Sequence, residues 1–302
     1  MLQKPKVIVI VGPTATGKSS LAVKLAKRVG GEVISADSRQ VYKGLDIGTG
    51  KVTEKEMRGI PHHLLDVASP KQQFTAAQFR TKAARAIRDI LAHGKVPILV
   101  GGTGFYIDTV LGNISFPEVP PDTTLRQELE TKPLLELLEK LEALDPERAE
   151  TIERANPRRI IRAIEIARAL GKVPRIGKKD EHYDALKIGL TLPDQELRSR
   201  ITIRLFARIR GGMIAEAKRL HKKGLSWKRM RELGLEYRFL ADYLTSKLTQ
   251  KEFEEGLGSA ISHYAKRQMR WFKRDLDIAW FTPKEYSKIE KHVRTFLLNK
   301  DH

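Results

Sequence analysis

The sequence contains no cysteine among its 302 residues. This absence excludes a disulfide scaffold, a cysteine-ligated zinc site, an iron–sulfur cluster and a catalytic thiolate. Long apolar segments are also lacking, because the longest purely apolar run, residues 7–11, is far shorter than the roughly 20 residues that cross a membrane. The N-terminus has no hydrophobic stretch typical of a secretory signal. We therefore expect a cytoplasmic protein without membrane contact.

Acidic side chains are outnumbered: 37 Asp and Glu residues stand against 56 Lys and Arg, a formal net charge of +19. Such an excess favours a polyanionic partner, because each phosphate neutralised by Lys or Arg releases condensed counterions. A basic surface that only keeps the protein soluble is the alternative. The charge is unevenly spread, since residues 116–156 carry 11 acidic and 5 basic side chains, whereas residues 200–302 carry 12 and 24. We interpret the acidic segment as an inserted subdomain.

The first hundred residues alternate apolar, β-branched segments with segments of helical periodicity. Continuous apolar runs are typical of strands buried on both faces of a parallel sheet. Apolar residues at helical spacing predict helices over 20–29 and 76–93. This alternation predicts an α/β fold with an open parallel sheet and helices on both of its faces. Strands are expected at residues 7–11, 33–35, 96–100, 188–192 and 278–281.

A change of character follows the proline-containing linker at residues 117–121. The next segments are rich in leucine, have helical spacing and give no strand signal. We predict a small all-α subdomain over residues 116–185, inserted into a catalytic core formed by residues 1–115 and 186–302. Its helices are expected over residues 124–144, 146–155 and 157–170, and helices again dominate from residue 194 onward.

A phosphate-binding pattern follows the first strand. Residues 12–19, GPTATGKS, match G-x-x-x-x-G-K-[ST] between a buried strand and a helix, which predicts a P-loop and a kinase-like version of the fold. In such a loop, backbone N–H groups face an anion at a helix N-terminus, the lysine adds positive charge, and the Ser19 hydroxyl is placed for Mg²⁺. An ordinary glycine-rich turn is the alternative. We predict that a di- or triphosphate is bound by Gly12, Thr14, Ala15, Thr16, Gly17, Lys18 and Ser19.

The pattern does not by itself identify the reaction. The sequence has no Asn-Lys-x-Asp element for guanine, and the strand at 96–100 ends in glycine rather than in a carboxylate. GTPases and motor ATPases are therefore disfavoured, which leaves proteins in which a second substrate lies beside the phosphate loop. Asp37 follows the second strand, at the sheet edge where ligands collect, and could act as a general base. Alternatively, it could cap a helix, with Gln40 three residues later.

Seven segments occur in an order that resembles the bacterial tRNA dimethylallyltransferase (tRNA isopentenyltransferase) family, over about residues 7–280. These segments are residues 12–19, 35–40, 42–49, 60–66, 101–106, 159–165 and 264–268. The resemblance implies transfer of a dimethylallyl group from dimethylallyl diphosphate to N6 of the adenosine 3′ of the anticodon. It implies pyrophosphate as the leaving group, Mg²⁺ as cofactor and the tRNA anticodon stem-loop as partner. Because no phosphoryl group moves, this chemistry agrees with the missing strand-end carboxylate.

The resemblance also implies roles for individual residues. Asp37 would be the general base at the adenine amino group, and Lys18 and Arg204 would serve the diphosphate. Without the resemblance, Arg204 is one more solvated arginine on a basic helix, and the arginines at 158–162 are a basic face that need not contact RNA. Contacts with tRNA are implied for Asp37, Ser38, Arg39, Gln40, Thr103, Arg126, Arg158, Arg159, Arg162, Lys266 and Arg267.

The chain departs from the family pattern at several positions. Arg208 stands where methionine is usual, and residues 233–238 and 261–263 differ from the common segments. Two other functions remain open: an ATP-dependent nucleoside or small-molecule kinase, and a non-catalytic RNA-binding P-loop protein in which Asp37 would be dispensable. We expect the chain to act as a monomer.

Overall fold

The computed structural model describes residues 4–114, 117, 119–174 and 182–299. The chain forms two compact units, one containing Met1–Gly112 and Asp180–His302 and the other containing Asn113–Lys179. Of the boundaries predicted from sequence, residue 116 lies outside the described residues and residue 185 lies inside a strand of the first unit.

The first unit is built on a six-stranded sheet in the order β3-β2-β4-β1-β5-β6, and every neighbouring pair is parallel. This confirms the predicted open parallel sheet. The strand predicted at 188–192 instead runs from 184 to 190, and the two-residue β3 was not predicted because two histidines carry no apolar strand pattern. The strands are β1 (Lys6–Val11), β2 (Gly31–Ser35), β3 (His62–His63), β4 (Val96–Val100), β5 (Asp184–Leu190) and β6 (Ala279–Phe281).

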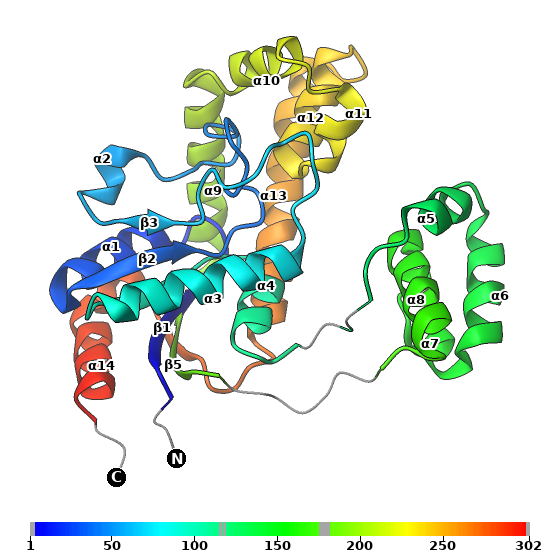
Figure 1. Cartoon of the computed structure of the whole chain (residues 1–302). Helices are drawn as coiled ribbons and strands as arrows, with labels where there is room; N and C mark the ends of the chain where they lie inside the picture. Colours follow the sequence, from blue (N-terminus) through cyan, green and yellow to red (C-terminus); the bar gives the residue numbers. More distant parts are fainter. Residues whose placement is uncertain (1–3, 115–116, 118, 175–181, 300–302) are drawn as a thin grey trace. The chain divides into compact units, whose positions relative to one another are not determined.

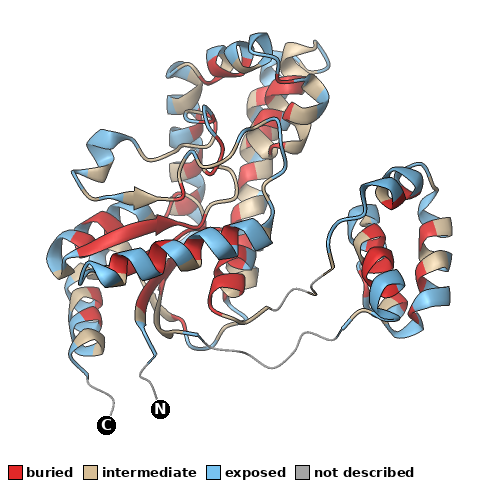
Figure 2. Ribbon diagram, viewed as in Figure 1, coloured by how far each residue is buried: buried red, intermediate tan, exposed pale blue. Residues whose placement is uncertain are grey.

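Helices cover both faces of the sheet (Figure 1), as the continuous apolar strands predicted. Successive side chains of a strand point to opposite faces. Accordingly, Ile8 and Ile10 of β1 pack with helices α1 (Lys18–Val29) and α14 (Tyr286–Leu298), whereas Val7 and Val9 pack with α3 (Ala76–Ala92) and α4 (Gly104–Val110). Figure 2 shows the resulting buried strands and buried inner helix faces in red.

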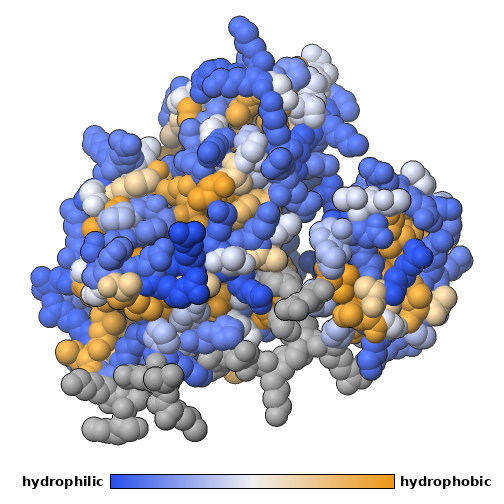
Figure 3. Space-filling view, in the orientation of Figure 1, coloured by the Kyte–Doolittle hydropathy of each residue, from blue (hydrophilic) through white to orange (hydrophobic). Residues whose placement is uncertain are grey.

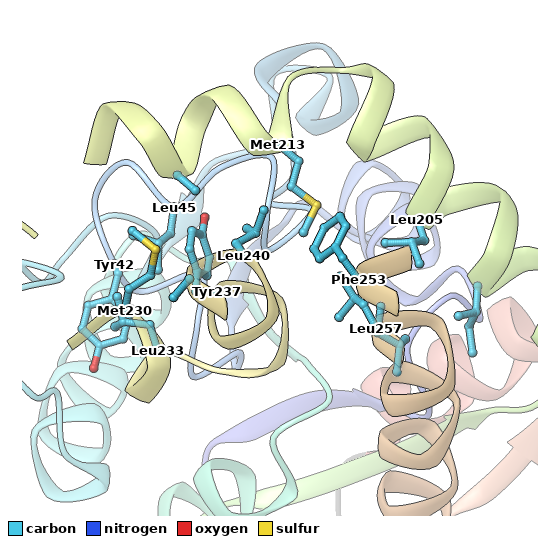
Figure 4. Packing of buried hydrophobic residues seen from close by; sticks show 14 of the residues in the cluster. Tyr42, Leu45, Leu205, Met213, Met230, Leu233, Tyr237, Leu240, Phe253 and Leu257 are labelled. Atoms are coloured by element: carbon cyan, nitrogen blue, oxygen red, sulfur yellow. The ribbon is translucent and has the colours of Figure 1, made fainter. Parts of the chain in front are cut away.

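A second core lies among the helices between β5 and β6. Side chains from the segment after β2 and from five helices pack together there, including Tyr42, Met213 and Phe253 (Figure 4). This packing holds the helical part of the first unit against the loops that follow the strands. The helices are α9 (Asp194–Arg210), α10 (Met213–Lys222), α11 (Trp227–Glu232), α12 (Leu235–Leu244) and α13 (Gln250–Phe272). The remaining short elements of the unit are α2 (Glu54–Met57) and the 3₁₀ turn η1 (Pro283–Glu285).

Within its described residues the second unit has α-helices and no strand, and it has its own hydrophobic core. The helical segment predicted over 124–144 is two helices, because Pro133 precedes the second one and cannot donate a backbone N–H to a continuous helix. Asn156 caps the last helix by accepting the N–H of Arg159 at 3.3 Å. The helices are α5 (Thr123–Glu130), α6 (Leu134–Leu144), α7 (Pro146–Thr151) and α8 (Pro157–Leu170).

Candidate active site

The phosphate loop connects β1 with α1. Its first glycine, Gly12, has φ +137°, and a Cβ there would lie 2.3 Å from the carbonyl oxygen of Leu190 in β5, so a side chain cannot be accommodated. Ala15 and Gly17 adopt left-handed backbone conformations, with φ values of 65° and 94°. Left-handed residues of this kind curl the backbone into a concavity that can bind an anion. Helix α1 begins directly after Gly17, so its N-terminus faces the same loop.

Lys18 is held by the loop that it belongs to. Its Nζ donates a 2.7 Å hydrogen bond to the carbonyl oxygen of Pro13. Burial is the main cause that lowers the pKa of Lys18 to about 7; the charge of Asp37 opposes this shift, and the charge of Arg204 adds to it. Asp37 and Arg204, the other two residues predicted to be catalytic, therefore lie close enough to the Lys18 amine to act on it electrostatically.

Asp37 lies immediately beyond β2. One of its carboxylate oxygens, Oδ1, accepts hydrogen bonds from the N–H groups of Arg39 at 2.8 Å and Gln40 at 3.3 Å. The residues that follow Asp37 form a turn and not a helix. The prediction that Asp37 caps a helix is therefore wrong, although its side chain does cap this turn. Within the described residues Oδ2 has no hydrogen-bond partner, so this oxygen is left available for a further contact.

The loops after β2 and β4 are tied together beside Asp37. These strands are neighbours, with Ser35 opposite Val100. Thr103 donates its N–H to the carbonyl oxygen of Ala36 at 3.2 Å, and its hydroxyl oxygen accepts the N–H of Ser38 at 3.1 Å. The sequence-predicted residues 37–40 and 103 thus form one group at the carboxyl edge of the sheet, where ligands of α/β folds collect.

Helix α13 approaches the same edge. Burial raises the pKa of Tyr264 to about 12, with a further contribution from the negative charge of Asp37. Lys266 and Arg267 are exposed on this helix, and the Arg267 guanidinium lies 5.7 Å from the centre of the Tyr264 ring. Hydrophilic residues also cover most of the face of the molecule in Figure 3.

Arg204 lies on α9 beside the loop of residues 46–50. A Cβ on Gly50 would lie 3.4 Å from Nη2 of Arg204. Although Arg204 is an exposed residue, partial desolvation of its guanidinium lowers the pKa of that group, and the neighbouring Arg208 lowers it further. Arg208 donates to the carbonyl oxygen of Gly48 at 2.6 Å and pairs with Glu236 at 3.2 Å. Arg208 and Glu236 both lie where the chain departs from the family pattern. These two departures therefore contact each other, and Arg208 also holds the loop at Gly48.

The loop has a second anchor, which the sequence did not assign a role. Glu216 of α10 is buried, and its carboxylate accepts the N–H groups of residues 46, 47 and 48 at 3.0, 2.8 and 2.9 Å. The Tyr237 hydroxyl donates a fourth bond, and Figure 4 shows its oxygen directed toward α10. An acidic residue in the first turn of α10 is the only sequence signal for this arrangement, and it fits an ordinary helix N-terminus equally well.

Four arginines predicted to contact tRNA belong to the second unit. Arg126 binds the buried carboxylate of Glu165 through Nε and Nη2, both at 2.7 Å, and Arg162 adds a bond of 3.1 Å. Although burial opposes ionisation, these bonds hold the pKa of Glu165 below its ordinary value. Arg159 pairs with Glu153 at 2.6 Å on the surface, and Arg158 is exposed. Two of the four are thus part of an internal ion pair, and the tRNA contacts of all four stay predictions.

The described residues offer neither a ready metal-binding cluster nor a membrane-spanning helix. They contain no group of three or more His, Cys, Asp or Glu side chains placed to hold a metal ion. Across the same residues, every helix is too short or too polar to cross a membrane.

Comparison with known proteins places these features in a family. The family model described as IPP transferase matches residues 40–275. A tRNA dimethylallyltransferase of Anoxybacillus flavithermus is 42% identical over 297 residues, covering 97% of this chain and 95% of the relative. One from Shouchella clausii is 40% identical over 310 residues, covering 99% of each chain.

Solved structures agree with the sequence relatives. The full-length tRNA isopentenylpyrophosphate transferase of Bacillus halodurans has a TM-score of 0.75 and 37% identity, with 97% of each chain covered. A eukaryotic dimethylallyltransferase captured acting on tRNA has a TM-score of 0.81 and 29% identity, covering 96% of this chain and 77% of that one. The chain belongs to the IPP transferase family.

Proposed function

We propose that this chain transfers a dimethylallyl group from dimethylallyl diphosphate to N6 of the adenosine 3′ of the anticodon in tRNA, releasing pyrophosphate. Its family membership and its tRNA dimethylallyltransferase relatives support prenylation of tRNA. The observation that carries the proposal is that Asp37 and Arg204 both lie close enough to the amine of Lys18, beside the phosphate loop, to act on it electrostatically.

The diphosphate half of the reaction needs positive charge around a leaving group. The bond between C1 of the dimethylallyl group and the diphosphate oxygen breaks, and negative charge develops on the pyrophosphate. The N–H groups of the phosphate loop and the amine of Lys18 oppose that charge, and Arg204 adds a second cation. These groups are held in place before substrate binds, so little reorganisation is needed during the reaction.

The acceptor half needs a base. As N6 of the adenine forms its new bond to C1, it must lose one proton, and Oδ2 of Asp37 can take it. The adenine must leave its stack to reach a site at the sheet edge, so we infer that it binds as a flipped base. Ser38, Arg39, Gln40 and Thr103 surround Asp37 and would contact that base. Exposed Lys266 and Arg267 would contact phosphates.

We infer that Mg²⁺ assists the diphosphate. Ser19 lies exposed in the first turn of α1 and offers a hydroxyl oxygen, the hard ligand that Mg²⁺ prefers. Mg²⁺ is usually held by one or two protein oxygens together with substrate phosphates, so a single hydroxyl fits it. When bound, the ion would neutralise part of the charge on the diphosphate. All the groups named for the transfer itself belong to one chain, so we propose that a cytoplasmic monomer suffices.

The test supplies purified protein with Mg²⁺, bulk tRNA and labelled dimethylallyl diphosphate, beside a reaction containing γ-labelled ATP. We expect label from dimethylallyl diphosphate at a single adenosine of tRNA and no transfer of phosphate from ATP. Phosphate transfer from ATP without prenylation would instead support a kinase. RNA binding without either reaction would support a non-catalytic RNA-binding protein.

A further inference from the structure

The side chain of Gln268 in α13 joins two loops of the site. Its Oε1 accepts the backbone N–H of Thr14 in the phosphate loop at 2.9 Å, and its Nε2 donates to the carbonyl oxygen of Gly102 at 2.9 Å. The orientation of the amide is fixed chemically, because a backbone N–H can only donate and a carbonyl oxygen can only accept. Gln268 is only 6% exposed, so both of these bonds matter for a buried polar group.

The loop after β4 is shaped to receive this helix. A Cβ on Gly102 would lie 2.1 Å from Nε2 of Gln268, and a Cβ on Gly104 would lie 2.2 Å from the Trp271 ring. Trp271 also donates its indole N–H to Asp108 in α4 at 2.9 Å. Glycine at 102 and 104 therefore lets one face of α13 lie directly on the loop backbone.

The amide closes a chain of hydrogen bonds across the site. On one side Gln268 holds Thr14 of the phosphate loop, and on the other it holds Gly102. The next residue, Thr103, is bonded to the backbone on both sides of Asp37, at Ala36 and Ser38. The loop for the diphosphate and the loop for the base are thus connected through a single side chain.

We propose that Gln268 is a positioning residue for the transfer, a role that rests on the proposed function: it sets the distance between the diphosphate loop and the loops around Asp37. It also occupies the N–H of Thr14, which leaves that residue only its hydroxyl for the diphosphate. Two reactants held in separate loops react only when their geometry is right, and a misplacement of about 1 Å can cost ~10²-fold in rate.

The experiment compares wild type with Gln268→Met, which keeps the side-chain length and removes both hydrogen bonds. Steady-state transfer gives kcat and the KM of each substrate. Calorimetry with inorganic pyrophosphate and filter binding of an anticodon stem-loop RNA give the two affinities separately. We expect kcat to fall by roughly 10- to 100-fold. Both affinities should stay within about threefold of wild type, because each loop still binds its own ligand.

Two further variants separate positioning from folding. Ile261→Val removes one methyl group from a buried residue of the same helix and should lower the melting temperature slightly without changing kcat. Gly102→Ala should reduce kcat, because its Cβ collides with Nε2 of Gln268. In a double variant with Gln268→Ala, which makes room for that Cβ, Gly102→Ala should cause no further loss of kcat.

The outcomes are distinct. Wild-type kcat in Gln268→Met overturns the positioning role while leaving the proposed function intact. If Gln268→Met binds neither pyrophosphate nor RNA and no longer unfolds in a cooperative transition, Gln268 is needed for folding. This result too overturns the positioning role. Wild-type protein that binds pyrophosphate and RNA without transferring the prenyl group would remove the proposed function and, with it, this inference.

Discussion

The hydroxyl of Tyr237 donates a 2.6 Å hydrogen bond to the buried carboxylate of Glu216. That carboxylate, 2% exposed, also holds three successive backbone N–H groups of the loop at 46–48. Four donors offset the cost of taking the negative charge out of water. Because the same loop continues to Gly50 beside Arg204, this internal contact helps to define where Arg204 lies.

Replacing Glu216 by glutamine should destabilise the protein. The new amide NH₂ would face backbone donors, so at least one buried N–H would lose its acceptor, at a cost of roughly 1–3 kcal/mol. Urea unfolding measures the change. Tyr237→Phe removes a single bond from the same carboxylate and serves as the control, with an expected loss of about 1 kcal/mol. A glutamine variant no less stable than Tyr237→Phe would contradict the anchoring role.

Asp37→Asn should abolish most of the transfer without disturbing the fold. The asparagine oxygen can still accept the N–H groups of Arg39 and Gln40, but the amide cannot take a proton, so kcat should fall by about 10²- to 10⁴-fold. Binding of pyrophosphate and of stem-loop RNA should be retained. Asp46→Asn, which changes an exposed carboxylate that pairs with Lys51, is the matched control. Near-wild-type turnover in Asp37→Asn would remove the base from the mechanism.

Diphosphate binding should take up a proton at alkaline pH. The pKa of Lys18 is about 7 against an ordinary value of 10.5, so above pH 7 the free protein holds mostly the neutral amine. A bound pyrophosphate favours the ammonium form, so the affinity should decline as the pH rises above 7. Calorimetry at pH 8 in buffers of different ionisation enthalpy measures the proton uptake. Lys18→Met should bind more weakly and take up fewer protons; equal uptake would assign the proton to another group.

The same pKa has a consequence for stability. The unfolded chain holds the Lys18 proton up to about pH 10.5, whereas the folded chain releases it near 7. Unfolding therefore takes up a proton between these values, and the lysine's contribution to stability becomes less unfavourable as the pH rises through that window. Lys18→Met should thus raise the melting temperature more at pH 6 than at pH 10. A constant difference across this range would argue against the lowered pKa.

The arginines of the second unit should behave differently from one another. Arg126→Met leaves the buried Glu165 with fewer partners and should destabilise this unit by roughly 1–3 kcal/mol, seen as faster proteolysis within residues 113–179. Arg159→Ala breaks an exposed pair and should scarcely change stability. If Arg159 binds a tRNA phosphate, its loss should reduce the salt dependence of tRNA binding by about one unit of slope. Matching proteolysis rates for the two variants would refute the distinction.

Local patterns in the sequence were enough to predict the sheet and the phosphate loop. The run at 7–11 is apolar on both faces because helices cover both, and the loop from Gly12 to Ser19 has the left-handed backbone positions that its glycine pattern predicts. The position of Asp37 follows from the end of β2 in the same way. Its capping pattern was also local, yet sequence alone could not tell a capped turn from a capped helix.

Contacts between distant segments could not be predicted. Glu216 meets the loop at 46–48 across about 170 residues, and Gln268 meets Thr14 across 254. Neither has a spacing that marks its partner, since each depends on how α10 and α13 pack against loops formed much earlier in the chain. The pairing of Arg126 and Arg162 with Glu165 could not be predicted for a different reason: a basic helix face has the same sequence pattern whether it contacts RNA or a buried carboxylate.

The place of β1 in the sheet bears on the order in which the protein folds. This strand pairs with β4 on one side and with β5 on the other, and the whole second unit is encoded between them. During synthesis one edge of this strand, which is apolar from Val7 to Val11, stays unpaired until about 190 residues have been made, and unpaired edges of this kind promote aggregation. The N–H of Thr14 lacks its native acceptor for longer still, until Gln268 has been synthesised. The phosphate loop is among the first segments to leave the ribosome and among the last to acquire its native contacts.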